Sequence, residues 1–224
     1  MLPNYTSHVI LFYVLLLSSY VNCSLLFGFK GKDSVVLSSS SKLGPNGLTL
    51  KSDFQFIRSL TDDTIVGFFG DHSDIEFLHG ELIKLCKEEE TLHGRTLSTT
   101  TLAEHCRYII TQHFGNHPLS LNVLIAGMCS RNKKAQLYLV DAIGSMKDMP
   151  YIACGREISF ILSLLDNINR EKSSLNEVGL SGVLEENELL EVVSRCWKSV
   201  QQRSILDYSH THTVRVGGKK HNVV

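Results

Sequence analysis

The sequence lacks an excess of charge of either sign. Its 224 residues carry 22 Lys and Arg against 23 Asp and Glu, which leaves a formal net charge of −1 at pH 7. A protein without a strong electrostatic field has no general attraction for nucleic acid or for an acidic membrane surface. Two small basic clusters, Arg131–Lys134 and Lys219–Lys220, are expected to be solvated turn and tail residues. The composition therefore predicts no nucleic-acid partner.

The sequence also lacks any short spacing between its cysteines. The six cysteines are Cys23, Cys86, Cys106, Cys129, Cys154 and Cys196. This spacing fits neither a zinc site nor a redox pair, and it is sparse for a secreted disulfide scaffold. Three of them lie on apolar stripes of predicted helices, where a free cysteine behaves as a small buried hydrophobic residue. We therefore expect reduced cysteines in an intracellular protein.

A long hydrophobic run occurs near the N-terminus, at Val9–Leu17. The apolar stretch is too short to span a bilayer comfortably, but it has the length of a signal-peptide core. No Lys or Arg precedes it, and no second Met occurs before Met128. A targeting sequence, a propeptide and a wrongly joined first exon all remain open. We expect residues 1–24 to be a leader, residues 25–224 to be one folded domain, and the mature form to have no membrane partner.

The clearest structural pattern is a hairpin in the middle of the chain. Leu121–Met128 and Ala135–Asp141 are rich in Val, Ile, Leu and Tyr, and the polar segment Cys129–Lys134 links them. The first run is apolar at nearly every position, which predicts a strand covered on both faces. Gly144 follows where the chain must leave the sheet.

The other predicted elements surround this hairpin. The predicted strands are Leu25–Phe29, Ser34–Ser39, a segment around Phe54–Ser59, Thr64–Phe69, Tyr151–Ala153 and, as edge strands, Ile205–Asp207 and His212–Val216. The predicted helices begin at Asp71 or Ser73, at Ser98–Thr101 with Thr101 and Glu104 spaced as a capping box, at Gly155 with Ile158 facing the core, and near Glu185. Residues Asn167–Gly182 are predicted to form a loop.

This order of elements predicts the fold class. Strands that are buried on both faces must be covered by helices, and two stacked sheets with a helix pair outside each meet that requirement. The expected fold is therefore α+β, a four-layer αββα sandwich.

The same order resembles the N-terminal nucleophile hydrolases, and among them the proteasome β subunits. Leu26–Phe29 resembles the first strand of that family, Thr64–Asp71 its strand–Gly–helix junction, and Leu121–Gly144 its central hairpin. Gly155 before a helix that runs to Asp166 resembles another family landmark. The start without a Gly-Thr processing pair, and Arg203-Ser-Ile-Leu, most resemble the non-catalytic subunit at the fourth ring position, designated β type 2.

The resemblance implies three catalytic positions, which we locate in this chain. Active members use an N-terminal Thr whose own amine accepts the hydroxyl proton, tuned by an aspartate and a lysine. Here the nucleophile position falls near Cys23–Ser24, the aspartate position near Ser39 or Ser40, and the lysine position near Gln55, with Lys51 nearby. The resemblance therefore predicts no catalytic residue, cofactor or metal in this chain.

We thus expect a structural subunit of the proteasome core particle, found in the cytoplasm and nucleus. Its expected partners are other β subunits in the ring and subunits of the α ring. The enzyme alternative is a secreted or luminal N-terminal nucleophile amidohydrolase that uses Cys23 or Ser24 after cleavage of the leader. A free-standing interaction domain is a third possibility.

Other side-chain combinations give weaker signals. His210 and His212 share one face of an extended strand, but we expect an exposed edge pair rather than a metal site. Asp141 with Ser145, and Asp166 with Ser163, are expected to bind backbone donors rather than to act in catalysis.

Overall fold

The computed structural model describes residues 25–44, 49–115, 117–129, 132–175, 186–217 and 222–223. The predicted leader, residues 1–24, lies outside these ranges. The strands are β1 (Leu25–Lys30), β2 (Val35–Ser40), β3 (Ile57–Thr61), β4 (Thr64–Gly70), β5 (Leu121–Met128), β6 (Ala135–Val140), β7 (Met146–Asp148), β8 (Tyr151–Gly155), β9 (Thr211–Val216) and β10 (Asn222–Val223). The helices are α2 (His72–His93), α3 (Thr99–His113), α4 (Ile158–Leu175) and α6 (Glu186–Arg203).

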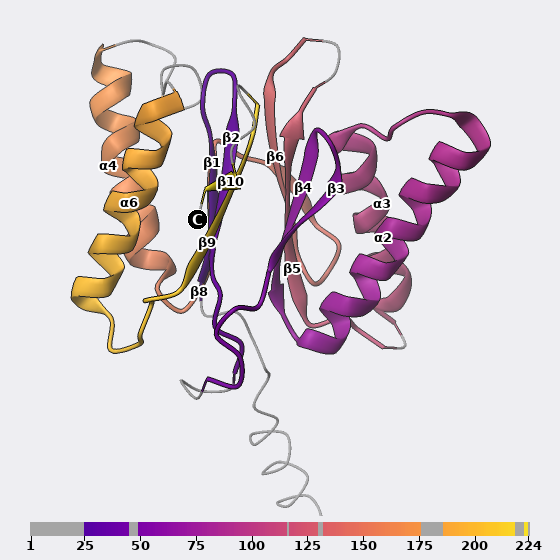
Figure 1. The fold of residues 1–224 in the computed structure, drawn as a ribbon, viewed down its shortest axis with the longest axis horizontal. Helices are drawn as coiled ribbons and strands as arrows, with labels where there is room; N and C mark the ends of the chain where they lie inside the picture. Colours follow the sequence, from indigo (N-terminus) through magenta and orange to yellow (C-terminus); the bar gives the residue numbers. More distant parts are fainter. Residues whose placement is uncertain are drawn as a thin grey trace, which may run out of the picture.

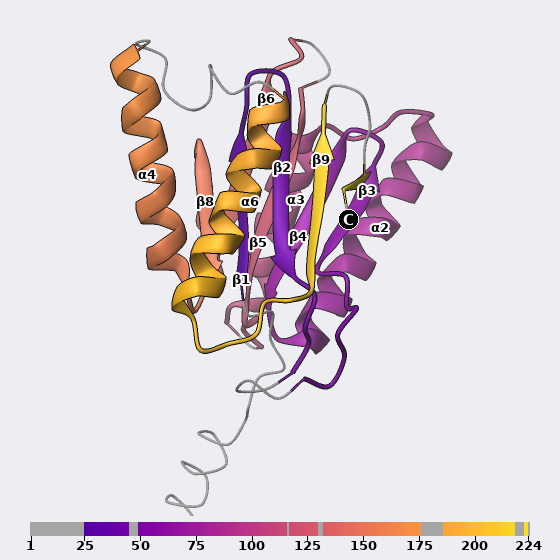
Figure 2. The same cartoon turned by 60° about the vertical axis from the view of Figure 1, so that its left-hand side comes forward.

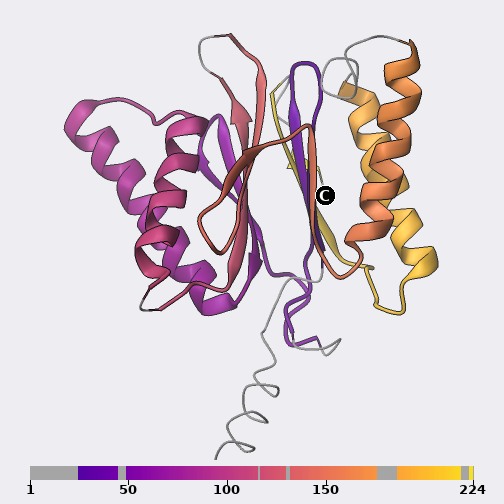
Figure 3. The same cartoon turned by 180° about the vertical axis from the view of Figure 1, so that it is seen from behind.

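These elements form four layers. Two five-stranded sheets, antiparallel throughout, lie face to face, with α4 and α6 outside one sheet and α2 and α3 outside the other (Figures 1 and 3). One large apolar cluster fills the space between the sheets and extends under α2 and α3, and a second lies under α4 and α6. The predicted α+β, four-layer αββα sandwich is confirmed.

The first sheet has the strand order β10-β9-β2-β1-β8. Leu26 of β1 lies opposite Ser39 of β2, and Ser39 lies opposite His212 of β9. Alternation along β2 sends Leu37 into the core between the sheets and Val36 into the core under α4 and α6. Figure 2 shows α6 and β9 from the side of this sheet.

The second sheet has the order β3-β4-β5-β6-β7 and is built around the predicted hairpin. Strands β5 and β6 pair from Val123 with Val140 to Met128 with Ala135. Every residue of β5 except Asn122 is buried, so the prediction of a strand covered on both faces is confirmed. The sequence pattern missed the short edge strand β7, and it placed β3 about three residues too early.

Helices α2 and α3 begin at polar caps. The side chain of Asp71 accepts from the backbone N–H of Ser73 at 2.9 Å, and Gly94 ends α2 in the left-handed conformation. The predicted capping box of Thr101 with Glu104 is wrong, because Ser98 is the N-cap of α3 and accepts from the N–H of Thr101. Glu104 instead pairs with Arg107.

The C-terminal part of the chain departs from the sequence prediction at several points. Residues 167–175 continue α4 instead of forming a loop, and residues 176–185 lie outside the described residues. Ile168 is buried under this helix, whereas Ile158, predicted for the core, is 36% exposed. The predicted strand at Ile205–Asp207 is absent from the described structure, and Ile205 is fully exposed. Strand β9 is not at an edge, because it pairs with both β2 and β10.

None of the cysteines that the structure describes forms a disulfide. Cys106, Cys154 and Cys196 are buried, while Cys86 and Cys129 are half-buried. Burial raises the pKa of the Cys106 thiol and of the Cys196 thiol to about 12, so these thiols stay protonated and unreactive.

We expect Gly127→Val to destabilise the protein by about 3 kcal/mol, at the upper end for an overpacked core. A Cβ at Gly127 would lie 2.3 Å from Thr99 Oγ1 and 2.5 Å from the carbonyl oxygen of Asp63. Lys133→Ala, in the exposed turn of the same hairpin, is expected to change stability by less than about 0.5 kcal/mol. Midpoints of chemical denaturation give the comparison, and a larger loss from Lys133→Ala would contradict the strand placement.

Candidate functional site

One of the expected catalytic positions lies beside the start of β1. Cys23 and Ser24 lie outside the described residues, but Leu25 opens β1 and pairs with Gly155 of β8. On the other side of β1, Leu26 lies opposite Ser39 near the end of β2. The start of β1 and the end of β2 are therefore neighbours, as the sequence resemblance implied.

The aspartate position holds buried hydroxyl groups. Ser39 and Ser40 are at most 1% exposed, and the Ser39 hydroxyl has no hydrogen-bond partner among the described residues. Ser38 turns to the opposite face, where its hydroxyl accepts from Trp197 Nε1 at 2.7 Å and lies 2.7 Å from Thr213 Oγ1. The end of β2 is thus polar and uncharged.

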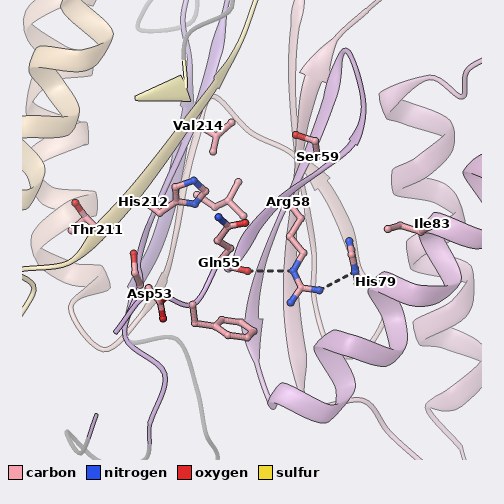
Figure 4. A pocket seen from close by; sticks show the side chains of 12 residues that line it. Asp53, Gln55, Arg58, Ser59, His79, Ile83, Thr211, His212 and Val214 are labelled. Carbon is pink, nitrogen blue, oxygen red and sulfur yellow. Dashed lines mark hydrogen bonds between the residues drawn. The ribbon is translucent and has the colours of Figure 1, made fainter. Parts of the chain in front are cut away.

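The lysine position is occupied by an amide. Gln55 is exposed and lines a pocket of about 600 Å³, together with Ser41, Asp53 and His212 (Figure 4). Its backbone carbonyl accepts from Arg58 Nε at 3.2 Å. Lys51, the nearby basic residue, is not among the residues that line this pocket and lies 3.8 Å from the Asp53 carboxylate.

The positive charge in the pocket belongs to Arg58 of β3. Its guanidinium donates to both carboxylate oxygens of Glu76 and lies 2.9 Å from His79 Nδ1, both on α2. The hydrogen bond from Arg58 lowers the pKa of Glu76 below its usual range. Burial, followed by the charge of Arg58, lowers the pKa of His79. Arg58 is therefore neutralised by Glu76, and His79 favours its neutral form.

His212 faces the same pocket from β9. It was expected in an exposed edge pair with His210, but β9 lies inside the sheet, and His212 is half-buried opposite Ser39. Its Nδ1 is buried without a hydrogen-bond partner among the described residues, and burial lowers its pKa. His210 lies before the strand and is exposed. The described part of the chain contains no group of three or more residues placed to hold a metal ion.

The remaining candidates have local structural partners. Asp141 accepts from the backbone N–H groups of Ile143 and Ser145 at 3.1 and 2.7 Å, as expected for a strand exit. Asp166 accepts a hydrogen bond from the Tyr151 hydroxyl, which was not expected. Among the described helices, none is both long enough and apolar enough to cross a bilayer.

The sequence analysis missed the contact of Arg58 with Glu76 and His79. Glu76 and His79 are three residues apart on α2, which places them on one helix face. That spacing was visible in the sequence, but nothing in it indicated which strand would supply a cation. The contact depends on β3 lying against α2, which is a tertiary feature.

The site can bind polar groups, but it lacks a charge-tuned nucleophile among the described residues. His212, Gln55 and Ser41 offer neutral donors and acceptors, and the charge of Arg58 is compensated by Glu76. An N-terminal nucleophile needs nearby charges that keep its amine in the basic form. The described walls of the pocket supply no lysine for that role.

The fold and the arrangement of this site define an N-terminal nucleophile hydrolase fold of the proteasome type. Residues 22–214 match the Proteasome family, described as "Proteasome subunit". This match spans most of the chain, and the chain therefore belongs to the proteasome subunit family.

Individual relatives agree with this assignment. Proteasome subunit beta type-4 of Saccharomyces cerevisiae is 24% identical over 189 residues, which cover 82% of this chain and 88% of the relative. Proteasome subunit beta 1 of Desulfurococcus amylolyticus is 29% identical over 139 residues, covering 62% and 67%. Proteasome subunit alpha type-2 of Oryza sativa subsp. indica is 28% identical over 160 residues, covering 70% and 67%.

The β character of the chain rests on several of these relatives. A second fungal protein, the probable proteasome subunit beta type-4 of Neurospora crassa, is 27% identical over 156 residues. The two fungal relatives carry the designation type-4, not the type 2 that the sequence motifs suggested. The chain is thus placed among the β-type subunits, without the designation type 2.

We expect the stability of the protein to fall between about pH 7.5 and about pH 5.5, and to fall less in His79→Gln. The folded pKa of His79 is lower than the ordinary 6.5, so the unfolded chain takes up the proton first as the pH drops. The folded state therefore loses relative stability below about pH 6.5, by less than about 1 kcal/mol, because the side chain is only half-buried. Glu76 adds to this loss only at lower pH.

Denaturation midpoints across this pH range give the measurement. His117→Gln, at an exposed histidine beyond α3, is the matched control. Its denaturation midpoint should change with pH as steeply as that of the unchanged protein. His212 contributes a loss of the same sign, so His79→Gln is expected to reduce the slope without removing it. Equal slopes for His79→Gln and the unchanged protein would show that His79 is not held neutral in the fold.

Proposed function

We propose that the chain is a non-catalytic structural subunit of the β ring of the proteasome core particle. The observation that carries this proposal is the absence of charge on the residues that the resemblance assigns to the aspartate and lysine positions. Ser39 and Ser40 occupy the aspartate position, and Gln55 occupies the lysine position. Without these charges, a nucleophile at the start of the chain has no group to tune its amine.

Membership of a family that builds multi-subunit proteases supports a role in assembly. The partners that we propose are other β subunits in the same ring and subunits of the α ring. Several large apolar side chains are exposed on the outer helices, among them Phe77 of α2 and Tyr108 of α3. Exposed apolar side chains of this size are suited to burial against neighbouring subunits.

We further propose the fourth ring position and a location in the cytoplasm and nucleus. The start without a Gly-Thr pair and the segment Arg203-Ser-Ile-Leu support the position. In the structure this segment begins at the last residue of α6 and carries the fully exposed Ile205. A side chain exposed in this way is available to a neighbouring subunit.

We expect the purified chain to hydrolyse no peptide. A fluorogenic peptide assay should give a rate for the unchanged chain equal to that of the double variant Cys23→Ala, Ser24→Ala. The physical reason is the uncharged surroundings of the nucleophile position, at Ser40 and Gln55. Turnover that disappears in the Cys23→Ala or Ser24→Ala single variant would overturn the structural role and favour the amidohydrolase alternative.

We also expect the endogenous chain to co-purify with a large multi-subunit protease, without its first 22 residues. The first described strand begins at Leu25, and an exposed apolar run such as Val9–Leu17 would be an aggregation hazard. Peptide mapping of the purified particle gives the test. Abundant peptides from Met1–Asn22 in the particle would contradict the leader assignment. Recovery of the chain from secreted or vesicular fractions alone would contradict the proteasome role.

A further inference from the structure

Strand β3 forms an open edge of the second sheet. It pairs with β4 on one side and has no strand on the other side among the described residues. The N–H of Phe68 donates to the carbonyl of Phe56 at 2.9 Å, so this pair is hydrogen-bonded across the ladder. Hydrogen-bonded and non-bonded pairs alternate along an antiparallel ladder. The backbone N–H and C=O groups of Ile57 and Ser59 therefore point outward, away from β4.

A groove follows this open edge. The pocket of about 600 Å³ curves around β3, between His79 and Ile83 of α2 and Val214 of β9 (Figure 4). A second pocket, of about 330 Å³, continues past the end of β3 toward the last turns of α2. Ser59 lines both pockets, so the two are adjacent along the strand. Ile57 and Ser59, whose backbone groups point outward, are among the residues that line this groove.

The two ends of the groove differ in chemistry. The larger pocket offers the apolar side chains of Ile83 and Val214 on opposite walls. The smaller pocket contains two carboxylates, Asp62 and Glu90, and no Lys or Arg among its lining residues. The nearby Arg95 is paired with Glu89 at 3.1 Å. The acidic end is therefore complementary to a basic side chain.

The strand lacks most of the features that protect sheet edges. Natural edge strands are commonly blocked by Pro, by Lys or by a covering element. The segment Ile57–Thr61 contains neither Pro nor Lys, and the side chain of Arg58 turns away to Glu76 on α2. The register shifts only beyond Ser59, at the far end of the strand. Five residues of β3 correspond to an edge of about 17 Å.

We propose that the open edge of β3 receives an extended segment of a neighbouring proteasome subunit, which adds to the sheet as a sixth strand. A segment of about five residues spans the edge and hydrogen-bonds to the outward groups of Ile57 and Ser59. It places one apolar side chain toward Ile83 and the next toward Val214, because successive side chains of a strand point to opposite faces, and it places a Lys or Arg beside Asp62 and Glu90. This inference rests on the proposed role in the core particle.

The test begins with a photocrosslinking residue in place of Ser59 in the tagged full-length chain. The assembled protease is purified from cells, irradiated, and its crosslinked peptides are identified by mass spectrometry. The expected crosslink joins position 59 to a segment of a different subunit that carries a Lys or Arg within about five residues. A crosslink to this chain's own residues, to a second copy of it, to a degradation substrate, or to nothing within the particle would overturn the inference.

Two further variants test the backbone and the charge separately. Ser59→Pro removes an outward N–H while leaving the bonds to β4 in place, and Ser59→Ala is its matched control. Loss of one backbone hydrogen bond is expected to lower the share of the chain in the particle about three- to tenfold for Ser59→Pro, and not for Ser59→Ala. Glu90→Arg should also lower the share of the chain in the particle. Glu88→Arg, at another exposed residue of α2, is its control and should not lower that share.

The outcomes separate this inference from the proposed function. If the unchanged chain is absent from the particle, both fail. If the unchanged chain assembles and Ser59→Pro and Glu90→Arg assemble equally well, the structural role stands and the edge contact is refuted. The denaturation midpoint of each purified variant is measured alongside. A lower share in the particle at an unchanged midpoint supports the contact, and a lower share explained wholly by a lowered midpoint counts against it.

Discussion

The structure depends on one constraint, the burial of both faces of its two sheets. The inner faces pack against each other, and each outer face packs against a helix pair, so the central strands have no solvent-facing side. The sheets also approach each other closely at their glycines. A Cβ on Gly67 would lie 2.9 Å from a methyl group of Leu26 in the other sheet. One on Gly28 would lie 3.6 Å from a methyl group of Leu137 in the other sheet, and 2.3 Å from a methyl group of Leu37, its neighbour in the same sheet. Larger side chains at these positions would separate the sheets and open the core that holds the fold together.

That constraint explains which parts of the fold could be predicted from the sequence. Double-sided burial leaves continuous apolar runs, and these runs located β1, β4 and β5 to within about one residue. The polar stretch after Asn167 carried no such signal, because only Ile168 of its first residues is buried beneath α4. Ile205 led to a predicted strand that the described structure lacks, because its apolar side chain is exposed and no local sequence pattern distinguished it from a core residue. Helix length and exposure in this region are decided by tertiary packing.

The positions of the two serines could be predicted from the sequence, but the side chains that surround the pocket could not. The resemblance assigned Ser39 or Ser40 to the aspartate position and Gln55 to the lysine position, and the strand register brings the two serines beside the start of β1. The position of His212 opposite Ser39 follows from the pairing of β2 with β9, which joins segments far apart in the chain. The same holds for Arg58 and Glu76. Pairings of this kind are set by topology, and a single sequence does not encode them in any local pattern.

Because the fold is stabilised by the burial of its sheets, its stability does not depend on charged residues at the site. The end of β2 is buried, so a carboxylate there is costly unless a partner charge compensates it. Serines at this end carry no charge to bury. The Ser38 hydroxyl has neutral partners in Trp197 and Thr213, and the Ser39 hydroxyl, without a partner among the described residues, costs less than an unpaired carboxylate would. The apolar contacts between the sheets need no charge at the site. A member of this family can therefore keep its packing, and the surfaces that contact its neighbours, while its catalytic positions hold uncharged residues.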